Sequence, residues 1–308
     1  MRRATIFVLS DVRSGSTLLD QCLGGHPSIT SLGEVHWLTA YVAQDRSLYN
    51  PLQPLSCTCG MTVRECPFWN GVERALGRPL DSLQLRHALK RPRHARGLLG
   101  ALRLVPRRLI KARPGLYRHR AIRSLLGGPR LGRDCVALYD AVSAATDRPF
   151  CVDSSKSAYR FRDVYHLDSA RTIAIALARD YRAVVHSKMK RGQSLQTAAV
   201  GWRRRMHQIQ LLTSDLPQDR IFRLKYESFC ENPSSELARL CKFIGIDFTE
   251  AMLQRATGSM HHIGGSPSKF DSRRVKISLD RAYEGQFAPD ALKSMRELVG
   301  NVAEHWGY

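Results

Sequence analysis

A strand, a polar turn and a helix follow one another near the start of the chain, and this junction constrains the fold more than any other stretch. Residues 5–9 are apolar or β-branched and predict a buried strand, and apolar residues at helical spacing predict a helix from residue 18 onward. Between them, Gly15 gives the backbone a freedom that other residues lack. Such a junction favours a phosphate or sulfate, because free amides and the positive end of the helix dipole point the same way. Arg13 adds a planar guanidinium suited to two anion oxygens.

The turn does not have the sequence of a nucleotide triphosphate loop. That loop reads G-x-x-x-x-G-K-[ST], and its lysine binds the outer phosphates while its hydroxyl binds magnesium. Here Ser10 or Asp11 stands at the first glycine position, and no lysine follows Gly15. The sequence therefore argues against a kinase or NTPase. Taken alone, the turn is equally consistent with an ordinary helix cap, because serine, threonine and glycine are common before helices.

Three later stretches predict further buried strands, at residues 150–152, 172–177 and 221–224. Helical patterns at 159–167 and 181–190 lie between them. Strands that are apolar along their length and alternate with helices are typical of a parallel sheet covered on both faces. The sequence therefore predicts an α/β fold with a central parallel sheet flanked by helices.

Polar and cationic residues follow these predicted strands. Ligands of open parallel sheets bind at the carboxyl ends of the strands. We therefore expect Arg13, Lys156, Arg179 and Tyr226 to meet at one edge. Glu34 follows a short extended piece at the same presumed edge, where a carboxylate either accepts a proton from a substrate hydroxyl or caps the next helix.

The chain is strongly basic, with a formal net charge of +21 in 308 residues. From Arg86 to Arg133 there are 15 Lys and Arg residues and no Asp or Glu. Apolar residues from Leu98 to Leu109 predict a basic amphipathic helix, which would lie on an anionic membrane, contact an acidic substrate or simply be solvated. No nucleic-acid motif accompanies the charge, so we expect no nucleic-acid partner.

Residues 49–77 are predicted to be rich in loops, because prolines and glycines punctuate them at Pro51, Pro54, Gly60, Pro67 and Gly71. Three thiols occur within ten residues of this stretch, at Cys57, Cys59 and Cys66. Zinc usually takes four protein ligands, and no fourth Cys or His stands nearby in the sequence. We therefore expect a structural or redox role for these thiols rather than a metal site.

The sequence has no run of about 18 apolar residues, and we expect no signal peptide, because the apolar stretch after Arg2-Arg3 is too short for one. These features predict a cytoplasmic enzyme.

Several blocks resemble sulfotransferases that use 3′-phosphoadenosine 5′-phosphosulfate (PAPS). The stretch VRSGSTLL at 12–19 resembles the 5′-phosphosulfate loop of that family, often written PRSGTTLL. Residues 178–191 resemble its 3′-phosphate segment, in which an arginine is followed eight residues later by a serine. The likeness is greatest to bacterial members that share motifs with tyrosylprotein sulfotransferases, since His26-Pro27 and Gly33-Glu34 match in spacing.

The resemblance implies a P-loop-NTPase-like sulfotransferase fold in a single domain over residues 1–308. The motifs leave about 49–147 unmatched, so the Cys-containing loop and the basic helical region are expected to be an insertion there.

The resemblance also implies residue roles. Glu34 would be the catalytic base, and Arg13 and Lys156 would stabilise charge on the transferring group. The nucleotide would contact Arg13, Ser14, Gly15, Ser16, Thr17, Leu18, Arg179, Ser187, Arg191, Tyr226, Ser266 and Lys269.

Together these features predict transfer of a sulfuryl group from PAPS to a hydroxyl, without a metal. The acceptor would be a small molecule, glycan, lipid or peptide, and the basic interval suggests an acidic one. A nucleotide-dependent phosphotransferase and a non-catalytic anion- or membrane-binding module are the alternatives. His26, His36 and His186 compete with Glu34 as the base, because histidine titrates near neutrality.

Overall fold

The structure is a computed structural model that describes residues 3–46, 54–87, 109–110, 112–254, 260–266 and 277–308. A five-stranded parallel sheet forms its centre, with strand order β2-β3-β1-β4-β5. The strands are β1 (Ala4–Ser10), β2 (Ile29–Ser31), β3 (Phe150–Asp153), β4 (Thr172–Ala178) and β5 (Ile221–Lys225). The predicted parallel sheet is thus confirmed.

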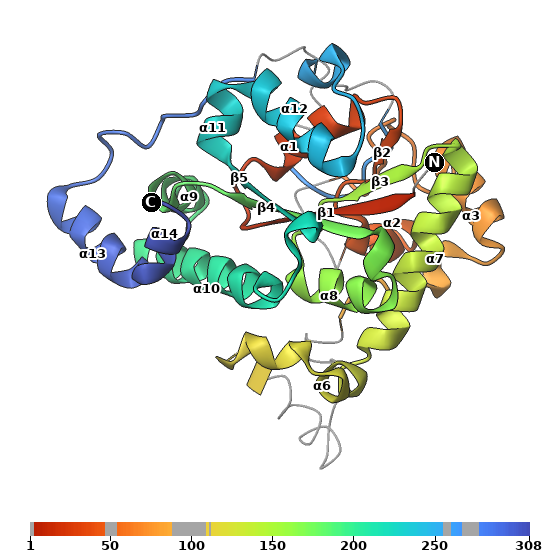
Figure 1. Cartoon of the computed structure of the whole chain (residues 1–308), viewed down its shortest axis with the longest axis horizontal. Helices are drawn as coiled ribbons and strands as arrows, with labels where there is room; N and C mark the ends of the chain where they lie inside the picture. The colour runs from red at the N-terminus through yellow and green to blue at the C-terminus, as the bar shows by residue number, and fades with distance from the viewer. Residues whose placement is uncertain (1–2, 47–53, 88–108, 111, 255–259, 267–276) are drawn as a thin grey trace.

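Helices cover both faces of the sheet (Figure 1). On one face lie α1 (Ser16–Gly24), α11 (Tyr226–Glu231) and α12 (Pro233–Ile244). The other face is covered mainly by α7 (Gly128–Thr146), α8 (Ala158–Leu167) and α10 (Leu195–Thr213). Further α-helices in the described residues are α2 (Leu38–Val42), α3 (Pro67–Leu76), α6 (Arg120–Leu125), α9 (Tyr181–Met189), α13 (Pro289–Val299) and α14 (Asn301–His305).

The central strand explains why apolar residues run without alternation. Ile6 and Val8 pack into the core shared with α1 and α12, whereas Phe7 and Leu9 pack into the core on the opposite face. All seven residues of β1 are buried. A strand with two buried faces gains from apolar side chains at every position, because each removes apolar surface from water.

Part of the 49–147 segment corrects the sequence analysis. The loop-rich interpretation of residues 49–77 is wrong for its last third, where Pro67 begins α3 and Gly77, with φ +70°, ends it. The basic region is helical where it is described, in α6, α7 and a 3-10 helix, η4 (Pro114–Arg118). The amphipathic helix predicted between Leu98 and Leu109 lies mostly outside the described residues. No helix in the described part of the chain has both the length and the apolar character that crossing a membrane requires.

Candidate active site

Each strand delivers a predicted site residue to the carboxyl edge of the sheet. Strand pairing aligns these ends, since Ser10 at the end of β1 lies opposite Leu177 near the end of β4. The residues that follow the strands, in sheet order, are Glu34, Lys156, Arg13, Arg179 and Tyr226. The sheet topology therefore gathers cations, a carboxylate and a phenol from five separate parts of the sequence.

The turn after β1 has an uncommon backbone conformation. Arg13 has φ +72° and Gly15 has φ +83°, both in the left-handed region. A Cβ at Gly15 would lie 2.3 Å from Cδ2 of Tyr226, so the phenol ring packs directly on the turn. Only glycine fits there, for both steric and conformational reasons.

Two serine hydroxyls of this turn are buried without a partner in the described part of the chain. They belong to Ser10 and Ser14. Leaving such a group unpaired costs about 1–3 kcal/mol, a penalty that a bound oxygen atom would remove. Ser16 is also buried, and α1 begins there, so its first free N–H groups lie beside the Ser14 hydroxyl. The turn therefore fits an anion.

A second cationic group lies against this turn. Arg179 donates from Nη1 to the carbonyl oxygen of Arg13 at 3.0 Å, and its guanidinium lies 4.3 Å from the ring centroid of Tyr226. Arg13 donates from Nε to Oγ of Ser187 at 2.9 Å. Burial lowers the pKa of Arg13, and the charges of Arg191 and Arg179 lower it further. The two predicted phosphate segments thus meet, and their cations repel one another until an anion binds.

One acidic side chain opposes these cations. Asp280 accepts from Arg179 Nη2 at 3.0 Å, although the Asp280 side chain is 54% exposed. The pKa of Asp280 is lowered, because hydrogen bonds from Arg179 and from the backbone of Ala282 outweigh burial, which acts in the opposite direction. An exposed carboxylate on a buried guanidinium occupies a position that suits a phosphate.

Glu34 and Lys156 form an ion pair at the other side of the edge. Lys156 Nζ contacts Glu34 Oε1 and also donates to the carbonyl oxygen of Ser154 at 3.3 Å. Trp37 donates from Nε1 to the second carboxylate oxygen at 3.3 Å. The Lys156 backbone has φ +62°, and the Ser155 amide within the same turn donates to Asp153 at 2.8 Å.

A distant segment holds the backbone of Glu34. The Glu34 amide donates to the Ile263 carbonyl at 2.6 Å, and the Ile263 amide donates to the Leu32 carbonyl at 3.0 Å. The amide of Ser266, in the same segment, lies 3.5 Å from Thr17 Oγ1. Ser266 therefore lies beside the start of α1, whereas Lys269 lies outside the described residues.

The competing histidines differ in their surroundings. His26 Nε2 lies 2.9 Å from the Asp247 carbonyl, and His26 Nδ1 accepts from the Ser28 amide, so both ring nitrogens serve a turn. His186 lies on α9, and its ring packs against that of Phe287. His36 is different, because its Nδ1 is buried without a partner among the described residues and burial holds its pKa well below the usual range. His36 therefore remains the competitor to test.

Two buried acids were missed by the sequence analysis. Asp11 pairs with Lys188 at 2.5 Å beneath the turn. Asp20 on α1 accepts from Ser31 at 2.6 Å and from Ser154 at 3.1 Å, and burial raises its pKa to about 7. Asp20 interrupts the apolar face of a predicted helix, and that interruption is the signal that could have identified it.

A cavity of about 930 Å³ opens beside Trp37. Its lining includes His36, Arg86, Lys188, Arg204 and Arg205, and the Arg86 guanidinium lies 4.0 Å from the centre of the Trp37 ring. This volume suits an organic ligand of moderate size.

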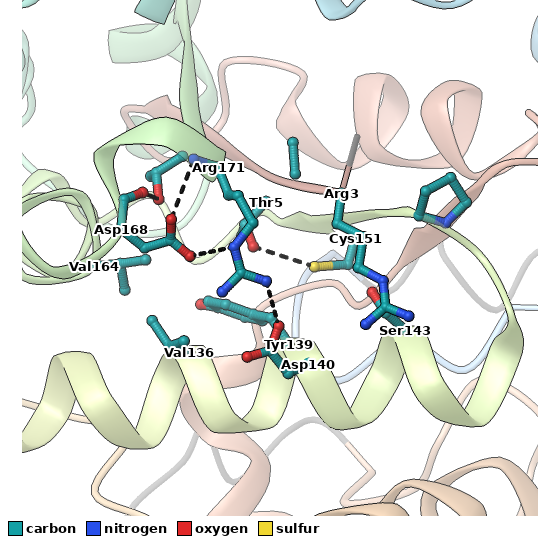
Figure 2. Close-up of a pocket in the computed structure, with 13 residues that line it drawn as sticks. Arg3, Thr5, Val136, Tyr139, Asp140, Ser143, Cys151, Val164, Asp168 and Arg171 are labelled. Atoms are coloured by element: carbon teal, nitrogen blue, oxygen red, sulfur yellow. Dashed lines mark hydrogen bonds and ion pairs between the residues drawn. The ribbon is translucent and has the colours of Figure 1, made fainter. Parts of the chain in front are cut away.

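A hollow at the opposite edge of the sheet is much smaller, at about 10 Å³ (Figure 2). Its side chains are engaged with one another: Arg171 bonds Asp140 at 2.7 Å and Asp168 at 2.6 Å. We assign this hollow to structure, because about one water molecule would fill it.

The expectation that the clustered thiols lack a fourth ligand is wrong. His261 Nδ1 lies 3.6 Å from Cys57 Sγ and 3.2 Å from Cys66 Sγ, and Cys59 completes the group. A residue about 200 positions away cannot be found from local spacing, because only the fold brings it near.

We predict that Gly15→Ala weakens nucleotide binding at this turn, because the new Cβ collides with the Tyr226 ring. Gly77→Ala is the matched control, since Gly77 has a similar φ of +70° but open space around it. Both variants should lose about 1 kcal/mol of stability from backbone strain. Calorimetry with adenosine 3′,5′-bisphosphate should detect a loss of at least tenfold in affinity for Gly15→Ala alone. Equal affinities in the two variants would contradict the contact.

Comparisons with known proteins agree with this geometry. The family model described as "Sulfotransferase family" matches residues 155–250, a range that includes Lys156, Arg179, Ser187 and Tyr226. A search of curated proteins found no match. A sulfotransferase domain from the Synechococcus PCC 7002 olefin synthase is 20% identical, with a TM-score of 0.58 over 100% of this chain and 96% of that one.

A sulfotransferase domain from the curacin biosynthetic pathway is 19% identical, with a TM-score of 0.56 over 100% of this chain and 99% of that one. At these identities the likeness establishes the fold. The resemblance to sulfotransferases is therefore confirmed, by the family model over residues 155–250 and by a chain that has the fold of sulfotransferase domains.

Proposed function

We propose that this protein transfers a sulfuryl group from PAPS to the hydroxyl of an acceptor by in-line displacement. The observation that carries the proposal is the contact between Arg179 Nη1 and the Arg13 carbonyl. It places a turn that suits one anion beside an arginine that suits another. PAPS carries anionic groups at both its 5′ and 3′ positions, so it matches this pair.

The turn from Arg13 to Thr17 would bind the 5′-phosphosulfate. The Ser14 hydroxyl and the N–H groups at the start of α1, including that of Leu18, are suitable donors to its oxygens. The Tyr226 ring packs against Gly15 and would form one wall of the nucleotide site.

Arg179, Ser187 and Arg191 would bind the 3′-phosphate. Arg179 presents a buried guanidinium, and Ser187 already accepts from Arg13 at 2.9 Å. The Asp280 carboxylate would leave Arg179 when the phosphate binds, because two anions cannot share one guanidinium without repulsion. Its exposure allows that movement.

The residues at the edge can support sulfuryl transfer directly. The acceptor oxygen forms a bond to sulfur while the bond from sulfur to the 5′-phosphate oxygen breaks, and the electron pair of that bond leaves with the bisphosphate. Arg13 and Lys156 would stabilise the charge that develops on the leaving oxygen. Glu34 would accept the hydroxyl proton of the acceptor. When Lys156 turns to the leaving group, the Glu34 carboxylate is released to act as the base.

The cavity beside Trp37 would hold the acceptor. It adjoins Ser155, one position before Lys156, and His36, two positions after Glu34. Trp37 gives it an apolar wall, and Arg86, Arg204 and Arg205 give it positive charge. We propose an acceptor that carries a hydroxyl, an apolar part and an anionic group.

We predict that Glu34→Gln reduces turnover at least a hundredfold, because the amide cannot accept the hydroxyl proton. Affinity for adenosine 3′,5′-bisphosphate should stay within about twofold, since the amide retains the size of the carboxylate. His36→Gln is the matched variant and should retain most of the turnover. A turnover assay with PAPS beside calorimetric titration decides the matter, and the reverse pattern would make His36 the base.

Arg179→Ala should weaken adenosine 3′,5′-bisphosphate at least tenfold, a loss of about 1.4 kcal/mol, and AMP much less. AMP lacks the 3′-phosphate that Arg179 is proposed to bind. Arg171→Ala, at the opposite edge of the sheet, should change neither affinity. Equal losses for both nucleotides would remove Arg179 from the 3′-phosphate site. Magnesium dependence with ATP hydrolysis would instead favour a phosphotransferase.

The acceptor class can be tested with two neighbouring arginines of α10. Lysate small molecules and lipids incubated with enzyme and PAPS should yield anionic compounds heavier by one SO₃ unit. For such an acceptor, Arg204→Gln should raise KM severalfold, because Arg204 lines the cavity. Arg203→Gln removes the same charge outside the cavity lining and should leave KM unchanged. Equal effects would mean that the charges steer the donor and do not contact the acceptor.

A further inference from the structure

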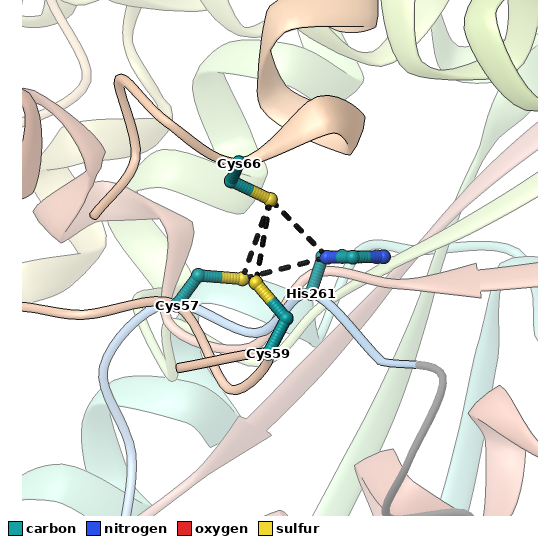
Figure 3. A group of neighbouring side chains, drawn as sticks. All are labelled: Cys57, Cys59, Cys66 and His261. Atoms are coloured by element: carbon teal, nitrogen blue, oxygen red, sulfur yellow. Dashed lines mark hydrogen bonds between the residues drawn. The ribbon is translucent and has the colours of Figure 1, made fainter. Parts of the chain in front are cut away.

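Three thiols and an imidazole converge between two segments that are far apart in the sequence (Figure 3). Cys57 and Cys59 lie in a tight turn, and Cys66 is the N-cap residue of α3. His261 comes from the 260–266 segment. The four ligand atoms all lie within 4.8 Å of one another.

The separations match the edges of a tetrahedron around one metal ion. Zinc binds sulfur at about 2.3 Å and imidazole nitrogen at about 2.0 Å, so tetrahedral geometry requires S–S edges of about 3.8 Å and S–N edges of about 3.5 Å. Here Cys66 Sγ lies 3.8 Å from Cys57 Sγ and 3.6 Å from Cys59 Sγ. His261 Nδ1 lies 3.2 Å and 3.6 Å from two of the sulfurs.

Burial raises the pKa of Cys57 and Cys66, and nearby N–H groups act against that rise. The backbone N–H of Cys59 donates to Cys57 Sγ, and that of Trp69 donates to Cys66 Sγ. Cys66 also stands at the start of the ten-residue helix α3, where the helix dipole favours negative charge. Such donors offset the charge of metal-bound thiolates.

The imidazole is held in place on two sides. Its ring stacks on Phe68, with 4.7 Å between centroids and 2° between planes. The next residue donates its amide to Thr58 Oγ1 at 2.9 Å, so the 260–266 segment is tied to the turn that carries Cys57 and Cys59. The Nδ1 atom is therefore oriented toward the sulfurs before any metal binds.

We propose that Cys57, Cys59, Cys66 and His261 bind one Zn²⁺ ion in a closed structural site. Four protein ligands fill the tetrahedron and leave no position for a substrate, which is the pattern of structural zinc. Thiolates favour zinc over magnesium or calcium, because soft ligands select soft or borderline metals.

The site is adjacent to the segment that holds Glu34. Two residues after His261, Ile263 accepts from the Glu34 amide and donates to the Leu32 carbonyl. The metal would therefore fix the loop 57–66 and the 260–266 segment as one unit, with Glu34 bonded to it. This last consequence rests on the proposed function, whereas the metal site itself does not.

The test is metal analysis of the full chain, purified without chelators. Elemental analysis and native mass spectrometry should find one zinc per chain. Exchange for Co²⁺ should give the strong visible bands of tetrahedral coordination and a near-ultraviolet thiolate charge-transfer band. Neither readout depends on activity, so failure of the sulfotransferase assignment would leave this result intact.

Variants locate the metal. Cys59→Ser and His261→Asn should each lose zinc, whereas Cys135→Ser, a buried cysteine of α7 outside the cluster, should keep it. His261→Cys should retain one metal ion and show a stronger charge-transfer band, because a fourth thiolate replaces nitrogen. If His261→Asn fails to fold, His261→Cys still tests whether residue 261 is a metal ligand.

Two results would overturn the proposal. One is metal-free folded protein in which all three thiols react freely or two of them form a disulfide, as a redox role requires. The other is a Co²⁺ spectrum unchanged by Cys59→Ser and His261→Cys. Stoichiometric iron in place of zinc, with the same dependence on the variants, would overturn the choice of metal.

Discussion

One hydrogen bond joins the two halves of the candidate site, from the Arg179 guanidinium to the Arg13 carbonyl at 3.0 Å. It depends on the register of the sheet, because β1 and β4 are neighbours and Ser10, the last residue of β1, lies opposite Leu177 near the end of β4. The acceptor carbonyl belongs to Arg13, whose backbone is left-handed, with φ +72°. The register of the sheet thus brings Arg13 and Arg179 together, and the turn supplies the carbonyl that joins them.

Buried ion pairs lie next to the turn that contains Arg13 and the turn that contains Lys156. Arg160 donates to Asp153 at 2.8 Å, both are almost completely buried, and Asp153 also accepts from Tyr139 at 2.6 Å. Asp11 and Lys188 form a second buried ion pair, next to the turn that contains Arg13. A buried ion pair seldom adds much stability over apolar packing, but removing one partner leaves a charge in the interior. We infer that these pairs specify the conformation of the loops they support.

The sequence analysis predicted those features of the fold that depend on a local pattern of residues. Apolar strands with two buried faces and the residues after them were found correctly, because strand ends in a parallel sheet share one edge. The helix α3 was missed, since Pro67 was interpreted as loop punctuation although it marks the start of the helix. Asp20 and His261 were missed for another reason. Their partners lie on other segments, so local spacing does not reveal their contacts, although Asp20 does interrupt the apolar face of its helix.

The distance along the chain between the turn at Cys57 and the 260–266 segment has a consequence for biosynthesis. Cys57 and His261 are 204 positions apart in the sequence but lie close together in the fold. The segment that carries His261 also bonds to the backbone of Glu34. Contacts of such long range form late, because the intervening chain must first be ordered. A ribosome-bound chain that ends before residue 260 therefore lacks the support of Glu34. Proteolytic resistance of this edge should arise only after residues 260–266 have been translated.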